Sequence, residues 1–303
     1  MNLAIIGLDT SHSVEFARRI QAPDCPPDQR VPGMRVTGCL RFETPFQNAE
    51  GLDKRQRQLE AWGVRVTLDL EEALDGCEAI LIEINDGAFH REYFERVAGR
   101  GKPVFLDKPL AASVEDGRAI LRLQRQHGTR VWSGSSIPFC PEVAAAAARF
   151  SRVDRAAVFG ALGRAPAGDS FVWYGVHTVE MLQRLMGRGA RSVRAVETAV
   201  SLIAAVDYGG DREGVVEAIR GWGQYGGRVQ GQAGETFLTL PFLCQTEHIY
   251  RDLLRQIKAF FEGAPEPVPL GDTFEGLAIM AAARRSIETG RRADVPGPDG
   301  GGN

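Results

Sequence analysis

The residues best suited to chemistry in this sequence are a lysine and the aspartate that precedes it. The apolar run 104–106 is typical of a buried strand, and it leads directly into Asp107-Lys108-Pro109. Pro109 fixes its own φ and keeps Lys108 out of the helical region, so the lysine backbone has little freedom. Because open α/β sheets bind ligands at the carboxyl ends of their strands, Lys108 is a candidate for contact with a substrate. A surface lysine at an ordinary strand end is the alternative interpretation.

A second candidate is the turn that follows the first apolar run. Dinucleotide-binding folds usually carry GxGxxG here, and this chain reads Gly7-Leu8-Asp9-Thr10-Ser11-His12. Gly7 is retained, whereas Asp9 and His12 stand where the second and third glycines are expected, and Asp9 brings negative charge toward a diphosphate. Thr10, Ser11 and the backbone N–H groups of the helix start can donate hydrogen bonds to a diphosphate, or the polar side chains can simply cap the helix. We predict that Gly7 to His12 take part in dinucleotide binding.

Arg41 follows the second predicted strand, where an acid usually binds the ribose hydroxyls of NAD. An arginine at this place suits the 2′-phosphate of NADP, and solvent exposure is the simpler explanation. The sequence therefore leaves NAD and NADP both open as the cofactor.

Alternating strands and helices position these residues in the first half of the chain. Buried-strand patterns recur with helical patterns between them. The predicted strands cover residues 3–6, 34–40, 64–67, 79–84, 104–106 and 130–135. This order predicts a doubly wound parallel sheet of the Rossmann type, forming an NAD(P)-binding domain over residues 1–135.

The second half of the chain changes character, with short β-branched segments separated by Gly-rich turns. The predicted strands are 156–161, 193–200, 203–208, 215–219 and 236–240, and the helices are 176–186, 247–261 and 273–289. We predict an α+β domain over residues 136–303, built on a large, mainly antiparallel open sheet that binds substrate and mediates oligomerisation. Residues 297–303 are predicted to form a disordered tail.

Composition narrows the function classes. The chain has 303 residues, 25% of them charged, with a net charge of −3, so neither nucleic acid nor a membrane surface is an expected partner. The five cysteines lack CxxC spacing, and Cys244 and His248 alone do not make a metal site, so we predict no metal and a cytoplasmic location. The first apolar run is too short for a signal peptide, and no later run approaches a membrane span.

Several motifs together resemble the glucose-fructose oxidoreductase / inositol dehydrogenase / MocA family. They follow the family's order along nearly the whole chain and comprise 79–82, His90, 101–110, 173–182, 271–277 and 289–292. The resemblance implies an N-terminal Rossmann domain binding NAD(P) and a C-terminal domain that often forms homodimers or homotetramers. It also implies hydride transfer between a nicotinamide cofactor and a secondary alcohol of a sugar or polyol.

The resemblance also assigns roles to individual residues. Asp107-Lys108-Pro109 matches the family's E/D-K-P motif, whose lysine lies by the reacting hydroxyl and the nicotinamide. His177 matches the histidine of the DxGxH motif, which implies proton transfer and substrate orientation, although a histidine satisfied by packing at a helix start is the alternative. Trp173 stands where that motif has its aspartate, so one carboxylate of the usual catalytic group is missing.

The remaining candidate residues flank these motifs. Asn85 and His90 lie in a loop similar to the family's TPNxxH loop, which implies contact with the cofactor. Trp173 and Tyr174 can form an apolar wall on which a sugar ring stacks, or they can belong to the core.

The mechanism predicted from these residues is alcohol oxidation. Lys108 stabilises the alkoxide, His177 takes the proton, and Asp107 holds Lys108 or helps to place the nicotinamide ribose. Two other functions stay open. One is an altered or inactive family member that acts as a ligand sensor or accessory subunit, and the other is a lyase or epimerase that uses tightly held NAD transiently.

Overall fold

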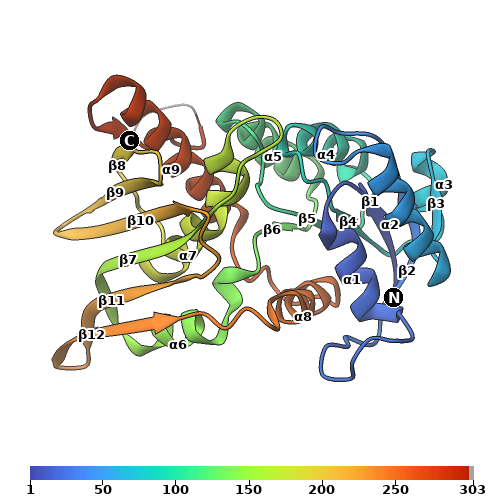
Figure 1. Ribbon diagram of the computed structural model, residues 1–303, viewed down its shortest axis with the longest axis horizontal. Coiled ribbons are helices and arrows are strands. Elements are labelled where there is room, and N and C mark those ends of the chain that lie inside the picture. The colour runs from blue at the N-terminus through green and yellow to red at the C-terminus, as the bar shows by residue number, and fades with distance from the viewer. Residues whose placement is uncertain (300–303) are drawn as a thin grey trace. The chain divides into compact units, whose positions relative to one another are not determined.

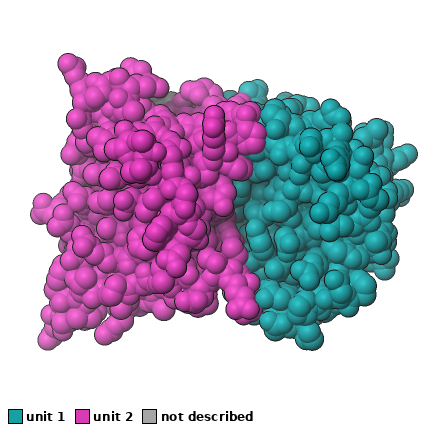
Figure 2. Space-filling model, viewed as in Figure 1, with its two compact units in different colours: residues 1–111, 119–134, 250–270 teal, residues 112–118, 135–249, 271–303 magenta. Residues whose placement is uncertain are grey.

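The computed structural model describes residues 1–299, and the chain forms two compact units (Figure 2). The first unit comprises Met1–Ala111, Ala119–Gly134 and Tyr250–Leu270. The second comprises Ala112–Arg118, Ser135–Ile249 and the residues from Gly271 onward. The division after Gly134 lies one residue from the boundary predicted from the sequence, but residues 250–270 return to the first unit, which the sequence pattern did not indicate.

A parallel six-stranded sheet forms the first unit, in the order β3-β2-β1-β4-β5-β6 (Figure 1). Its strands are β1 (Asn2–Ile6), β2 (Arg35–Leu40), β3 (Arg65–Thr67), β4 (Ala79–Ile82), β5 (Val104–Leu106) and β6 (Val131–Ser133). The strand order reverses between β1 and β4, which is where Rossmann folds bind their ligands. The predicted doubly wound parallel sheet is confirmed.

Helices flank these strands, and several of them begin at polar caps. They are α1 (Ser11–Gln21), α2 (Ala49–Ala61), α3 (Leu70–Leu74), the 3₁₀ turn η1 (Gly87–Phe89), α4 (His90–Ala98), α5 (Val114–His127) and α8 (Ile249–Phe261). At the start of α1 the Thr10 hydroxyl accepts a hydrogen bond from the His12 N–H at 3.3 Å. The caps of α2 and α3 follow the same rule, with Asn48 and Asp69 as acceptors.

Aromatic packing explains why α8 belongs to the first unit. The rings of Phe105 on β5 and Trp132 on β6 meet edge to face at 5.0 Å, and Trp132 lies 6.2 Å from Phe260 on α8. The Arg130 guanidinium covers the Phe260 ring at 4.8 Å. These contacts join segments far apart in the sequence, so the local pattern of residues 250–270 could not assign them to this unit.

A seven-stranded mixed sheet forms the second unit, in the order β12-β11-β7-β10-β9-β8-β13. Its strands are β7 (Arg152–Leu162), β8 (Ser192–Glu197), β9 (Ser201–Gly209), β10 (Arg212–Arg220), β11 (Gly226–Ala233), β12 (Thr236–Leu243) and β13 (Ala293–Asp294). The helical elements are η2 (Ile137–Phe139), α6 (Pro141–Arg149), the π-helical turn η3 (Phe171–Gly175), α7 (Val176–Met186) and α9 (Leu270–Thr289). Only β7 and β10 pair in parallel among the described strands of this sheet, so the predicted mainly antiparallel sheet is confirmed.

The structure of the second half differs from the sequence prediction in three local features. Strand β11 was not predicted, because its Gly-rich, polar sequence has weak strand propensity and only pairing with β7 and β12 defines it. Helix α6 was also not predicted. The predicted disordered tail begins too early, since the buried Gly297 carbonyl accepts two hydrogen bonds from Arg118, at 2.8 and 3.1 Å. Residues 300–303 of that predicted tail lie outside the described residues.

Two further features are the length and polarity of the helices and the state of the cysteines. Across residues 1–299, every helix is too short or too polar to cross a membrane. All five cysteines are buried and free.

Candidate active site

Lys108 lies where the sequence places it, at the carboxyl end of β5, and it is only 4% exposed. Within residues 1–299, no hydrogen-bond acceptor or ion-pair partner engages its ammonium group directly. Its positive charge acts at longer range on two buried carboxylates, those of Glu83 and Asp107. A nearly buried ammonium without a direct protein partner can bind an oxygen of a ligand, because burial strengthens electrostatic interactions.

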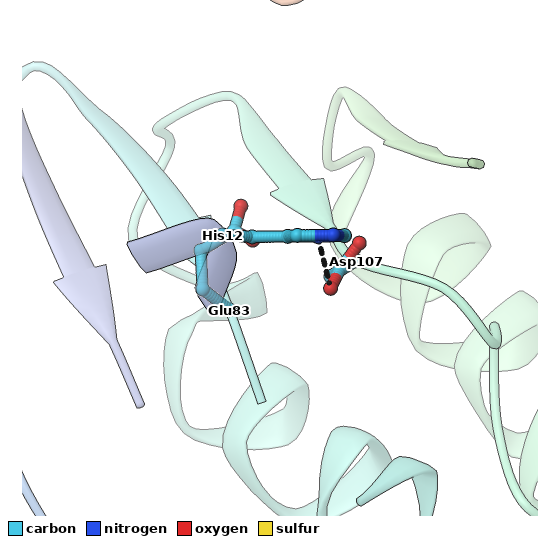
Figure 3. Close-up of side chains that lie close together, drawn as sticks. All are labelled: His12, Glu83 and Asp107. Atoms are coloured by element: carbon cyan, nitrogen blue, oxygen red, sulfur yellow. Dashed lines mark ion pairs between the residues drawn. The ribbon is translucent and has the colours of Figure 1, made fainter. Parts of the chain in front are cut away.

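Asp107, the first residue beyond β5, faces a histidine rather than the lysine. Its backbone N–H donates to the Ile82 carbonyl at 2.9 Å, which extends the pairing of β5 with β4. Its carboxylate lies 2.8 Å from Nδ1 of His12 (Figure 3). Burial by itself raises the pKa of Asp107, but attraction to His12 and Lys108 and hydrogen bonds together outweigh burial, so the pKa is lowered. Asp107 is therefore ionised at neutral pH.

Glu83 lies close to His12 and Asp107, and it was not predicted as a site residue from the sequence. It is the first residue beyond β4, its backbone N–H donates to the Ile6 carbonyl at 2.8 Å, and its side chain is 0% exposed. One carboxylate oxygen lies 3.9 Å from Nδ1 of His12. Burial, and then repulsion by Asp107, raise the pKa of Glu83 well above its ordinary value. A signal was present in the sequence, because an acid directly after four apolar strand residues is unusual in a buried sheet.

Asp9 braces the turn after β1. Its carboxylate accepts hydrogen bonds from the Asn85 backbone N–H at 2.8 Å and from the Thr44 hydroxyl at 2.7 Å. Burial raises the pKa of Asp9, and those hydrogen bonds oppose the rise only in part. The Asp9 carboxylate therefore connects the loop after β2 to the loop after β4. Asp9 thus has a structural role in the turn.

The turn from Gly7 to His12 retains features that fit a dinucleotide. Gly7 has φ +103°, and a Cβ atom at this position would lie 2.4 Å from the Glu83 carbonyl oxygen. The glycine thus brings the turn against the loop after β4. Leu8 and Thr10 are buried, whereas Ser11, the first residue of α1, is exposed and available to a ligand. The start of α1 supplies backbone N–H groups and the positive end of a helix dipole, which suit a diphosphate.

Arg41 stands directly after β2, but its guanidinium is already engaged. One nitrogen lies 2.6 Å from the Asp53 carboxylate, and another donates to the Gln56 side chain at 2.6 Å. Both partners belong to α2. Arg41 is therefore bound to the helix, and the carboxylate beside it opposes a second negative group such as a 2′-phosphate.

His90 and Asn85 stabilise the same end of the sheet. His90 is 0% exposed, with Nε2 at 2.7 Å from the Ile84 carbonyl and Nδ1 at 3.4 Å from the Leu110 carbonyl. Burial lowers the pKa of His90, although the nearby carbonyl groups oppose the change. The ring lies between the loop after β4 and the segment after β5, where Pro109 is also buried. In this structure His90 positions the loops that a cofactor would contact.

The predicted substrate residues lie in the second unit, on a π-helical turn and the helix that follows it. Trp173 and Tyr174 belong to η3, their rings 5.2 Å apart. His177 is the second residue of α7, is 8% exposed, and packs edge-on against Tyr174 at 5.3 Å and Tyr225 at 6.0 Å. The sequence did not predict the π turn, and such turns are frequent at functional sites. The structure thus brings His177 and the two aromatic residues together on one continuous segment.

An ion-pair network holds this segment in place. Arg284 on α9 contacts both carboxylate oxygens of Asp169 at 2.6 Å and also pairs with Glu197 at the end of β8. Asp169 in turn accepts from the Phe171 backbone N–H at 2.7 Å, at the start of η3. Two-point contact between arginine and carboxylate fixes orientation as well as distance.

The sheet order, the glycine turn and the buried lysine define a Rossmann dinucleotide-binding protein joined to a second α/β unit. Residues 47–135 match the profile of a family described as "Oxidoreductase family, NAD-binding Rossmann fold". Over this part of the chain, the match confirms the resemblance to the glucose-fructose oxidoreductase / inositol dehydrogenase / MocA family. The members of this family are nicotinamide-dependent oxidoreductases.

Solved structures share the fold over nearly the full length. A putative myo-inositol dehydrogenase from Sinorhizobium meliloti is 17% identical, with coverage of 97% of this chain and 99% of the other, at a TM-score of 0.76. Scyllo-inositol dehydrogenase from Lactobacillus casei, solved with NAD(H) and scyllo-inositol, is 13% identical with coverage of 97% and 99%, at a TM-score of 0.75. A probable dehydrogenase from Thermotoga maritima is 14% identical with coverage of 97% and 99%, at 0.77. No curated protein matches the sequence.

Proposed function

We propose that this protein is an NAD-dependent oxidoreductase that transfers a hydride between the nicotinamide and a secondary alcohol of a sugar or polyol. The observation that carries the proposal is the nearly buried ammonium of Lys108 at the carboxyl end of β5, without a direct protein partner among the described residues. The oxidoreductase family match supports the cofactor class. The two inositol dehydrogenases with the same fold support the substrate class.

The chain's own residues have distinct tasks in this proposal. The cofactor, when bound, accepts or supplies the hydride. Lys108 holds the substrate hydroxyl and stabilises the negative charge that develops on its oxygen. His177 accepts the hydroxyl proton, a role that the family resemblance implies. Trp173 and Tyr174 offer apolar faces against which a sugar ring can lie.

Calorimetric titration of cofactor-stripped protein with NAD⁺ and NADP⁺ tests the proposal first. We expect saturable binding of NAD⁺ at micromolar concentrations, followed by formation of NADH with at least one member of a panel of inositols and sugars. Folded protein that binds neither cofactor, oxidised or reduced, would favour the sensor function instead. Bound NAD that survives purification, with no net reduction during turnover, would favour a lyase or epimerase.

The contact between Arg41 and Asp53 leads to a prediction about cofactor choice. We expect wild-type protein to prefer NAD⁺, because the Asp53 carboxylate engages Arg41 and repels a 2′-phosphate. Asp53→Asn is expected to improve NADP⁺ affinity relative to NAD⁺ by about twofold to fivefold, the range of a partly exposed charge interaction. Glu50→Gln removes the same charge from the same helix and serves as the control. An unchanged ratio of the two dissociation constants in Asp53→Asn would exclude this role for Arg41.

A second prediction concerns the role of His177 as proton acceptor, and it is tested by a pH profile. His177→Asn is expected to lower kcat for alcohol oxidation by about 100-fold, because a positioned proton acceptor is lost. The acidic limb that a histidine base gives to the kcat/KM profile is expected to disappear. His127→Asn, at an exposed position, is the control. A variant with reduced kcat but the wild-type pH profile would show that His177 has only a packing role.

We also propose a cytoplasmic homo-oligomer. The five free cysteines fit a reducing compartment. On the second sheet, Val196, Ile203 and Phe237 are 52%, 37% and 53% exposed, and an oligomer interface would remove such apolar side chains from water. Light scattering of purified protein distinguishes a dimer or tetramer from a monomer.

A further inference from the structure

We propose that His12, Glu83 and Asp107 form a binding site for a divalent transition-metal ion. The inference goes beyond the proposed oxidoreductase activity and does not depend on it. The ligand atoms of the three side chains, His12 Nδ1 and one carboxylate oxygen from each acid, all lie within 4.8 Å of one another (Figure 3). All three side chains are buried, and all three belong to the first unit.

The backbone explains why residues so distant in the sequence meet. Glu83 and Asp107 are each the first residue beyond a strand, and the strands β4 and β5 are neighbours in the sheet. His12 enters from the first turn of α1, which follows β1 on the other side of β4. Rings of Phe16 and Tyr250 pack against the imidazole, at 5.7 and 5.1 Å, and fix its orientation. A site built on strand ends and a packed helix is rigid enough to select a ligand.

The Glu83 carboxylate is the group whose surroundings favour a bound cation most strongly. Neither of its carboxylate oxygens has a hydrogen-bond partner among the described residues, and the side chain is 0% exposed. Buried polar groups are nearly always hydrogen-bonded, and buried charges are paired or coordinate metals. In the observed geometry, a neutral carboxyl group would still leave its O–H donor without an acceptor. A bound cation would satisfy the Glu83 carboxylate.

The distances suit one ion. Nitrogen and oxygen ligands bind zinc at about 2.1 Å, so two of its ligand atoms can be at most about 4.2 Å apart. Nδ1 of His12 lies 2.8 Å from an Asp107 oxygen and 3.9 Å from a Glu83 oxygen. The terminal torsions of these three side chain types are soft, so small rotations can bring the two carboxylates together around an ion.

Charge and donor type narrow the identity of the ion. The two carboxylates balance a divalent charge beside the ammonium of Lys108. One imidazole nitrogen with two oxygens suits Zn²⁺ or Mn²⁺, whereas Ca²⁺ requires six to eight oxygen ligands. Three protein ligands leave at least one coordination position for water or for an oxygen of a ligand.

The test measures metal binding rather than activity. Tag-free protein is stripped with a chelator, dialysed, and titrated with Zn²⁺ or Mn²⁺ by calorimetry, with the bound metal counted by mass spectrometry. We expect one ion per chain, and at least about tenfold weaker binding in both Glu83→Gln and His12→Asn. Glu95→Gln and His127→Asn change exposed residues of the same unit and should bind as wild type does.

A spectroscopic measurement on wild-type protein keeps the test independent of how the variants fold. Mn²⁺ bound at this site is expected to show coupling to a single imidazole nitrogen by pulsed electron paramagnetic resonance. Folded protein that binds neither ion, bound Mn²⁺ without a coupled nitrogen, or unchanged affinity in folded Glu83→Gln and His12→Asn would overturn the proposal.

Discussion

Replacing Lys108 by methionine is expected to lower kcat for alcohol oxidation by about 100- to 1,000-fold, the usual effect of removing a group that stabilises an oxyanion. Methionine keeps much of the length and apolar stem of lysine but removes the charge. The ammonium is nearly buried and has no direct protein partner among residues 1–299, so its loss should disturb few structural contacts. Stopped-flow or steady-state measurement of NADH formation gives kcat.

The control for this prediction is Lys54→Met, which removes a charge from an exposed position of α2. Calorimetry should show that Lys108→Met still binds NAD⁺ within a few fold of wild type. Turnover by Lys108→Met within about threefold of wild type, with intact cofactor binding, would remove Lys108 from the reaction. The proposed oxidoreductase function would then need another group to stabilise the alkoxide.

The second large effect, a loss of stability, is expected for Gly7→Ala. A Cβ atom there would lie 2.4 Å from the Glu83 carbonyl oxygen and 2.8 Å from the Ile84 side chain, and the positive φ is itself unfavourable for alanine. Backbone strain and overpacking each contribute about 1 to 3 kcal/mol, so we expect the free energy of unfolding of the first unit to fall by about 2 to 6 kcal/mol. Denaturant unfolding followed by circular dichroism measures the change.

Gly76→Ala provides a matched control, because Gly76 also has a positive φ, +65°, but a Cβ atom there meets no atom within 4 Å. It isolates the conformational penalty, which we expect to be about 1 kcal/mol. Equal destabilisation by the two substitutions would mean that the turn moves away from Glu83 without a penalty. In that case Gly7 would not fix the distance between the turn and the loop after β4.

The structure explains in physical terms why the glycine motif is altered. Asp9 replaces the second glycine, and its carboxylate is used to hold the loops after β2 and β4. His12 replaces the third glycine, and its ring faces Asp107 and Glu83. The departures from GxGxxG therefore build a buried polar cluster beside the turn, and they leave Gly7 and the start of α1 in place for a dinucleotide.

The local pattern of the sequence determined the elements that carry the candidate residues. The alternation of buried strands and amphipathic helices in residues 1–135 specifies a parallel sheet, because apolar runs of strand length must be buried on both faces. The abrupt change from Val104–Leu106 to Asp107 and Lys108 marks the end of a strand, and the structure has β5 end there. The position of His177 near a helix start likewise followed from the local pattern.

Only the tertiary structure decided which side chains meet. No local signal indicates that Asp107 faces His12 rather than Lys108, because the rotamers and the neighbours on β1 and β4 determine that contact. The engagement of Arg41 by Asp53 depends in the same way on how α2 packs beside β2. Long-range pairing also overrides weak local propensity, as in the Gly-rich strand β11 and in α8, which returns to the first unit through Trp132 and Phe260. Sequence periodicity specifies which face of an element is buried, whereas contacts between elements depend on strand order, register and side-chain direction.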